Sequence, residues 1–316
     1  MAAAIQGPSV KRIFLLVATN LAILLMLTIV ARLFGLDQWL AANGVSFGAL
    51  LAFAALFGFG GSFISLLMSK WIAKRSMGVQ VIEHPVDPEE VWLLETVRAQ
   101  SHAVGIGMPE VGIFESPAPN AFATGAKRDS ALVAVSTGLL RTMRKEEVEA
   151  VLAHEVSHIA NGDMVTLTLI QGVLNTFVIL LARVIGGAID RVLSRGENEE
   201  GGMGYFVAVM ISELLLGVLA GVIVMAFSRY REFRADRGGA RLAGTHQMIC
   251  ALESLQRSHR EQLPAPQLSA FGVDGSVGAG IKRLFMSHPP IEERIAALRA
   301  GASLTYSTSN ADIRRA

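Results

Sequence analysis

The most specific arrangement of reactive side chains in the sequence is a pair of histidines four residues apart. His154 and His158 enclose Glu155 in a His-Glu-x-x-His pattern with apolar flanks that indicate a helix. Residues four apart lie on one face of a helix, so both imidazoles can bind one zinc ion. Glu155 is placed to take a proton from a metal-activated water molecule. The pattern predicts peptide-bond hydrolysis, and two surface histidines on an ordinary helix are the alternative.

A second pair, Glu232 and Asp236, has the same spacing and directly follows an apolar stretch. A hydrolytic zinc site needs a third protein ligand and one open position, and a carboxylate suits that need. The outer Asp236 can accept the N–H of a ligating histidine. The alternative is a solvated acidic pair, neutralised by the neighbouring arginines Arg229, Arg231, Arg234, Arg237 and Arg241. We expect one Zn²⁺ per chain, held by His154, His158 and Glu232.

Four apolar blocks predict membrane-spanning helices around these motifs, over about 13–34, 45–69, 164–189 and 206–228. Each is close to or above the ~20 residues that cross a bilayer. The composition agrees, because 52% of the residues are hydrophobic and only 17% are charged. The net charge of +1 gives no indication of nucleic-acid binding. A lipid bilayer is therefore the expected surroundings of much of the chain.

Basic residues next to the blocks predict the orientation, since Lys and Arg are retained on the cytosolic side of a membrane. Lys11 and Arg12 precede the first block, Lys70 follows the second, and the arginine cluster follows the fourth. Both termini and the catalytic part are therefore expected in the cytosol. The predicted domains are a membrane hairpin 1–69, a catalytic part 70–163, a second hairpin 164–228, a second catalytic part 229–302 and a flexible tail 303–316.

The polar segments predict a cytosolic α+β metallopeptidase domain with a small sheet, within a mostly α-helical membrane protein. We expect helices over 89–104, 139–160, 230–242, 247–260 and 290–298. Strands are expected over 111–114 and 131–135, and 79–82 is expected to be extended. The segment 117–125 lies between the two strands. Asn161-Gly162-Asp163 is expected to bend the chain between the histidine helix and the third block.

Two charged residues, Arg183 and Glu213, lie inside the third and fourth blocks. Counting from the outer ends of the blocks places them at nearly the same depth. An unpaired charge there is costly, so an ion pair is expected, with snorkelling of Arg183 as the alternative. His288, next to two prolines, is a candidate donor to the oxyanion of the reaction, and a surface turn is the other interpretation.

The whole pattern resembles the HtpX family of bacterial inner-membrane zinc metallopeptidases, which are related to CAAX prenyl endopeptidases. The resemblance extends over nearly the whole chain and includes the segments Pro119–Gly125, Asn161–Asp163 and Ser287–Arg294. It implies that His154, His158 and Glu232 are ligands, that Glu155 is the general base and that Asp236 supports a ligand. Asn120 and Asp163 are included as residues that support the ligands or contact substrate.

The resemblance implies quality control of damaged membrane proteins, so the expected partners are membrane proteins or unfolded polypeptides. In this family the segment from Asn120 to Gly125 lines the cleft and can bind substrate by strand addition, although an ordinary turn suits its residues equally. Processing of lipid-linked peptides is an alternative activity. A non-catalytic metal-binding membrane protein is a third, but a metal transporter would carry ligands within its spans. The oligomeric state does not follow from the sequence.

Overall fold

The computed structural model describes residues 41, 44, 46–193, 203–262, 286 and 288–301. The predicted first span 13–34 and the tail 303–316 lie outside the described residues. The chain divides into two compact units. Of the described residues, the sheet-bearing unit contains 67–164 and those from 225 onward, and the helical unit contains those up to 66 together with 165–224.

A four-stranded mixed sheet is at the centre of the sheet-bearing unit. Its strands are β1 (Gln80–Val81), β2 (Glu110–Phe114), β3 (Ala121–Thr124) and β4 (Leu132–Ser136), in the order β1-β2-β4-β3. β2 and β4 are parallel, and the outer pairs are antiparallel. The strands expected over 111–114 and 131–135 are therefore present, shifted by a residue at their ends. The segment 117–125, for which no strand was predicted, contains β3.

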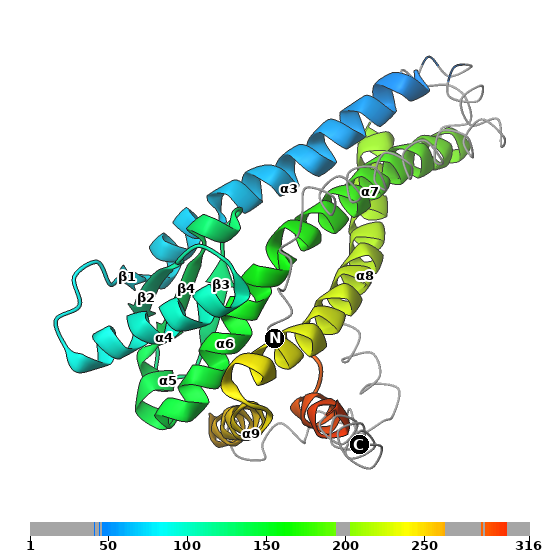
Figure 1. The fold of residues 1–316 in the computed structure, drawn as a ribbon. Helices are drawn as coiled ribbons and strands as arrows, with labels where there is room; N and C mark the ends of the chain where they lie inside the picture. The colour runs from blue at the N-terminus through cyan, green and yellow to red at the C-terminus, as the bar shows by residue number, and fades with distance from the viewer. Residues whose placement is uncertain are drawn as a thin grey trace, which may run out of the picture. The chain divides into compact units, whose positions relative to one another are not determined.

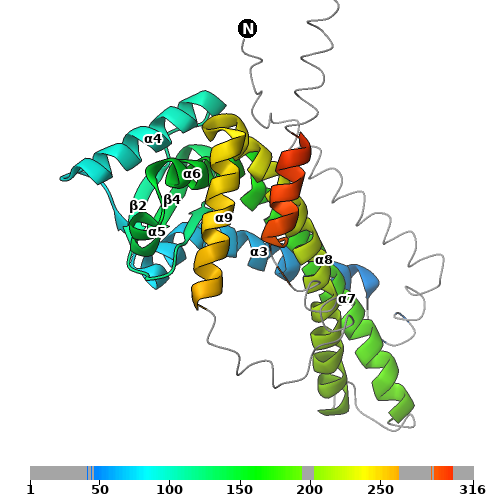
Figure 2. The same cartoon turned by 90° about the horizontal axis from the view of Figure 1, so that it is seen from below.

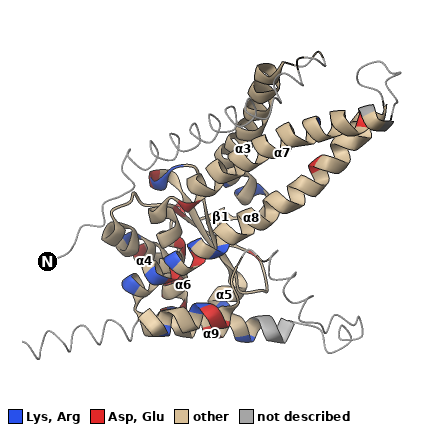
Figure 3. Ribbon diagram, turned by 90° about the vertical axis from the view of Figure 1, so that its right-hand side faces the viewer, with Lys and Arg blue, Asp and Glu red and all other residues tan. Residues whose placement is uncertain are grey.

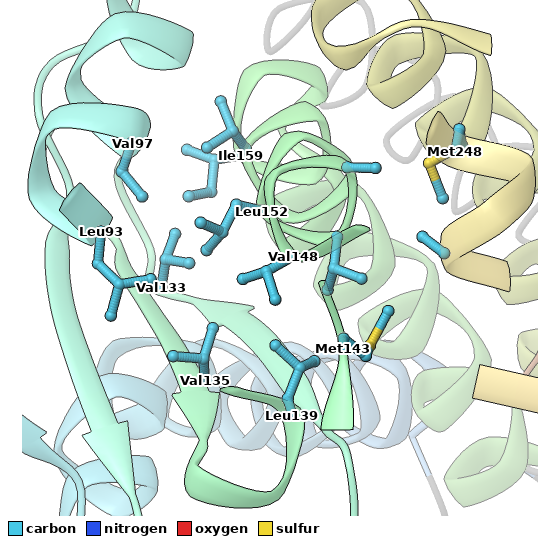
Figure 4. Close-up of a cluster of buried hydrophobic side chains, with 14 of the residues drawn as sticks. Leu93, Val97, Val133, Val135, Leu139, Met143, Val148, Leu152, Ile159 and Met248 are labelled. Carbon is cyan, nitrogen blue, oxygen red and sulfur yellow. The ribbon is translucent and has the colours of Figure 1, made fainter. Parts of the chain in front are cut away.

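Three helices pack on this sheet: α4 (Pro88–Val104), α5 (Thr137–Thr142) and α6 (Lys145–Asn161). A further helix, α9 (Thr245–Gln262), packs on α6, and residues 291–301 are also helical. Figure 4 shows Val148 and Leu152 of α6 directed towards Val133 of β4, with Met248 of α9 on the opposite side of α6. Figure 2 shows α9 beside α6. Because apolar neighbours surround α6, its side chains are held in fixed positions.

The prediction of one helix over 139–160 is wrong, because the chain breaks at Met143 and Arg144. Both residues have extended backbone, with ψ of 149° and 156°. The Glu147 carboxylate accepts the Arg144 N–H at 2.9 Å and so satisfies a donor at the start of α6. At the other end of α6, Gly162 has a φ of 69°, and α7 begins at Asp163. The expected bend at residues 161–163 is therefore present.

Three helices are long and apolar enough to cross a membrane: α3 (Phe47–Met77), α7 (Asp163–Leu193) and α8 (Met203–Ala243), with the apolar part of α7 ending at Asp190. Figure 1 shows α7 and α8 as long helices, and Figure 3 shows that they are mostly free of charged residues along their apolar stretches. These helices correspond to the predicted second, third and fourth spans. α8 also includes the helix that was expected separately over 230–242, so Glu232 lies beyond the apolar stretch that ends at Ser228.

Within the helical unit, α3 packs closely against α7 through a glycine. A Cβ atom on Gly58 would lie 2.6 Å from the backbone nitrogen of Thr176, so no side chain fits there. Asn175 donates a hydrogen bond of 3.3 Å to Ser62 across the same contact. Between α7 and α8, Arg183 Nη1 lies 3.0 Å from Glu213 Oε1, which confirms the expected ion pair. These contacts join the three helices inside this unit.

Candidate metal centre

The histidine motif lies on α6, where packing buries nearly every residue around it. From Ala150 to Ile159 all side chains are buried except Glu155, which is half-buried. His154 and His158 are 6% and 8% exposed. The helix thus shields its two imidazoles from bulk water, while the glutamate between them keeps contact with solvent.

α8 brings Glu232 to the two imidazoles. His154 Nε2 and His158 Nε2 are 3.1 Å apart, and Glu232 carboxylate oxygens lie 3.5 Å from the first and 3.3 Å from the second. Among the described residues, these three side chains form the group of His and acidic residues that can hold a metal ion.

This triangle fits zinc in its dimensions and its chemistry. Tetrahedral zinc with bonds of ~2.0–2.1 Å separates neighbouring ligand atoms by about 3.3–3.4 Å. The two imidazole nitrogens are 3.1 Å apart, Glu232 Oε2 lies 3.5 Å from His154 Nε2, and Glu232 Oε1 lies 3.3 Å from His158 Nε2. Two imidazole nitrogens with one carboxylate oxygen are also a usual ligand set of hydrolytic zinc sites. The residues present therefore fit a single zinc ion with one position left open.

Asp236 supports His154 and is itself held by an arginine. Its Oδ1 lies 3.0 Å from His154 Nδ1, and the Arg294 guanidinium binds both carboxylate oxygens at 2.6 and 2.8 Å. The Arg294 side chain is only 9% exposed. Arg294 was not predicted as a site residue, although it ends one of the segments that carry the family resemblance. It lies four residues after Pro290, at the start of a helix, and nothing in this local sequence indicates a contact with the metal centre.

Asp163 supports His158 in the same way. Its Oδ2 lies 2.7 Å from His158 Nδ1, its Oδ1 is bound by Arg234, and its backbone carbonyl accepts a bond of 2.8 Å from Arg231. Asp163 is fully buried. From the sequence, the two arginines were interpreted as basic residues that flank a span or that neutralise the acidic pair Glu232 and Asp236. Each ligand histidine is thus fixed by a carboxylate that is fixed in turn by arginine.

The carboxylates shift the proton equilibria of the site. Burial lowers the pKa of His158, but its hydrogen bonds to Asp163 and Glu232 outweigh burial and raise that pKa to about 10. The pKa of His154 is also raised, because Asp236 and Glu232 outweigh burial. Burial alone would raise the pKa of Glu232 and Asp236, but their histidine and arginine neighbours hold both below the ordinary range. The centre therefore favours bound positive charge, which suits a divalent cation.

Two further residues predicted from the sequence lie in different settings. His288 Nδ1 is 2.8 Å from Glu232 Oε2, and its side chain is 64% exposed, so it lies beside the centre but open to solvent. Asn120 is exposed and immediately precedes β3, and its backbone N–H donates to Ser136 Oγ at 2.9 Å. β3 is an outer strand of the described sheet and packs against α6.

The apolar helices and the His-Glu-x-x-His centre together define a membrane metallopeptidase. The chain belongs to peptidase family M48, whose family model matches residues 88–302. It is 61% identical over 291 residues to the Protease HtpX homolog of Thiobacillus denitrificans, covering 92% of this chain and 99% of that protein. It is 58% identical to Protease HtpX of Xanthomonas axonopodis pv. citri, covering 92% and 98%. The resemblance to the HtpX family is therefore confirmed.

The fold is also similar to that in the crystal structure of S. mikatae Ste24p. The TM-score is 0.59 at 19% sequence identity, with 86% of this chain and 64% of the Ste24p chain covered. The chain thus spans about two thirds of the length of Ste24p. At this identity the likeness concerns the fold alone.

Proposed function

We propose that the chain is a zinc endopeptidase that cleaves damaged or misfolded membrane proteins, or other unfolded polypeptides, on the cytosolic side of a bacterial inner membrane. The observation that carries the catalytic part is the cluster of His154, His158 and Glu232, whose nitrogen and oxygen atoms make contacts of 3.1–3.5 Å, next to the half-buried Glu155. Buried ligands beside one solvent-accessible carboxylate are what hydrolysis by an activated water requires.

Zinc, when bound, supplies a Lewis acid that polarises a carbonyl group and lowers the pKa of water to about 7. His154, His158 and Glu232 would hold it, while Asp236 and Asp163 fix the two imidazole orientations. The Glu155 carboxylate takes the proton of the attacking water and delivers it to the leaving amine. His288 Nε2 is the donor that we assign to the oxyanion, because Nδ1 already bonds to Glu232.

Substrate binding is assigned to the outer edge of β3. Within the described sheet, β3 pairs only with β4, so its second edge carries unpaired backbone groups beside α6. An extended peptide can add to such an edge as a further strand. Asn120 lies where this edge begins. An unfolded chain meets the requirement better than a folded one, because its backbone is free to pair.

The membrane arrangement belongs to the same proposal. The chain crosses the membrane four times, at about 13–34, 45–69, 164–189 and 206–228. Both termini and the metal centre then lie in the cytosol. The three apolar helices and the basic residues that flank them support this orientation. A cysteine at position 194, in a Cys250→Ser background, should then react with an impermeant reagent outside intact cells. A cysteine at position 287 should stay unlabelled, and the reverse pattern would contradict the orientation.

The decisive experiment compares zinc content and cleavage of an unfolded test protein in detergent for the wild type and Glu155→Gln. The variant should keep its zinc and lose at least ~10²-fold in kcat, because it lacks the base but no ligand. His288→Ala should keep zinc and also lose ~10²-fold in kcat. An active or zinc-free Glu155→Gln protein would contradict the assigned role of Glu155. An unchanged kcat for His288→Ala would remove that residue from the mechanism.

A further inference from the structure

The metal centre depends on how closely α8 approaches α6, because its ligands come from both helices. Two adjacent glycines, Gly238 and Gly239, lie inside α8 shortly after Glu232 and Asp236. Glycine is less favourable than alanine in a helix interior, so its presence there needs a reason. On this face of α8, α6 lies so close that it leaves little or no room for a side chain.

Gly238 lies directly over Ser157, the residue before the second ligand histidine. A Cβ atom at position 238 would collide with the Ser157 hydroxyl and come within 2.7 Å of Ser157 Cβ. Real Cβ atoms essentially never lie so close, and ordinary contact begins at 3.4 Å. Rotation of the hydroxyl cannot relieve the second collision, since Cβ is fixed to the backbone. Ser157 is 4% exposed and already donates to the Ala153 carbonyl at 2.7 Å.

Gly239 makes a milder contact. A Cβ atom there would lie 3.2 Å from the His154 backbone nitrogen and 3.0 Å from the Met248 sulfur. The sulfur lies near the end of a flexible side chain and can move. The backbones of the two helices therefore come very close at both Gly238 and Gly239. At Gly238, no nearby side chain can move to make room for a Cβ atom.

We propose that Gly238 is a positioning residue for the metal centre: the absence of a side chain lets α8 approach α6 at Ser157 closely enough for Glu232 to join His154 and His158. An added Cβ would push the helices apart by about 1 Å to reach ordinary contact. Metal–ligand distances are held to about ±0.2 Å, so such a shift would weaken the third ligand. The inference rests on the proposed zinc site and deepens it.

The test uses the full chain in detergent and measures the zinc dissociation constant by competition with a chromogenic chelator. Gly238→Ala should bind zinc at least ~10-fold more weakly, as do variants that disturb the support of a metal site. Gly238→Ala combined with Ser157→Gly should regain affinity to within about threefold of Ser157→Gly alone, because the second change removes the colliding atoms. If Gly238 served helix packing alone, Gly238→Ala would lower the thermal unfolding temperature but leave the zinc affinity of the folded protein unchanged.

Gly221→Ala is the matched control. It makes the same change in the same helix, but a Cβ atom at position 221 meets nothing within 4 Å, so zinc affinity should equal that of the wild type. Circular dichroism checks that each variant is folded. If Gly238→Ala fails to fold, recovery of folding and zinc binding in the double variant supports the proposal.

Unchanged zinc affinity in Gly238→Ala, or a double variant that recovers nothing, would overturn the assignment of Gly238. A wild-type chain that binds no zinc would instead refute the proposed metal site itself. The two failures are therefore distinguishable.

Discussion

Glu232 in the sheet-bearing unit contacts three histidines and an arginine, whereas Glu213 in the helical unit contacts a single cation, Arg183, among the described residues. The Glu232 side chain is 3% exposed and that of Glu213 is 38% exposed. Arg183 also donates to the Ile179 carbonyl and lies 4.7 Å from the centre of the Phe53 ring.

The two carboxylates show two ways to accommodate a charge away from bulk water. A fully buried charge needs several partners, and a network of partners also fixes a geometry. In the sheet-bearing unit, each ligand histidine contacts a carboxylate, and that carboxylate contacts an arginine, so the metal-binding atoms stay in place. In the helical unit, one ion pair neutralises charge and joins α7 to α8. The first arrangement suits chemistry, and the second suits helix association.

The largest effect should come from removing the shared carboxylate. Glu232→Ala should lower zinc affinity by more than the ~10–100-fold typical of outer partners, since it removes a ligand itself. Activity should fall with zinc content. Metal analysis after dialysis, beside Glu155→Gln as a variant that keeps its ligands, checks this. A Glu232→Ala protein with full zinc content would show that the triangle is not the metal site.

A smaller loss is expected at the arginine behind Asp236. Arg294→Gln should weaken zinc binding by about 10–100-fold, because Asp236 would no longer be held by two hydrogen bonds. Arg299→Gln in the same helix is the matched control, since its ion pair with Glu253 is exposed, and such pairs contribute little. Equal zinc affinities in the two variants would mean that Arg294 does not support the centre.

Glu147 is a buried carboxylate of the sheet-bearing unit that does not belong to the metal centre, so its replacement measures what such a charge contributes to stability. Burial raises its pKa, but hydrogen bonds from Arg144 and Ser254 outweigh burial and lower it overall. Glu147→Gln should cost about 1.5–3 kcal/mol of stability near pH 7, as hydrogen bonds to charged groups do. Because the folded-state pKa is lowered, this stability is full above the ordinary value of ~4.3 and is lost as the pH falls through the folded-state pKa.

Thermal unfolding of the wild type and Glu147→Gln at several pH values measures this difference. The difference in stability between the two proteins should disappear at low pH. A gap that stays constant with pH would mean that the carboxylate is not stabilised by its charge.

The smallest effect should come from the ion pair in the helical unit. Arg183→Gln and Glu213→Gln should each destabilise the protein in detergent, and the double variant should lose less than the sum. Polar contacts between membrane helices couple by about 0.6 kcal/mol on average and 1.7 at most, and we expect this range. Zinc affinity should stay unchanged in all three variants. Additive losses would show that the two side chains do not act as a pair.

The sequence by itself determined the features that are local. Hydropathy over about 20 residues predicts α3, α7 and the apolar part of α8, because crossing a bilayer imposes that length on neighbouring residues. The four-residue spacings of His154 with His158 and of Glu232 with Asp236 place each pair on one helix face without reference to the rest of the chain. The pairing of Arg183 with Glu213 also followed from counting along two neighbouring helices.

Only the tertiary structure decided which residues hold those side chains in place. Arg294 reaches Asp236 across 58 residues, and Arg234 reaches Asp163 across 71. No periodicity or spacing links partners that far apart, since folding brings them together through helix packing. The same applies to the break before α6, the pairing of β3 with β4 and the space at Gly238. Each depends on atoms of another element, so its physical cause is absent from the local sequence.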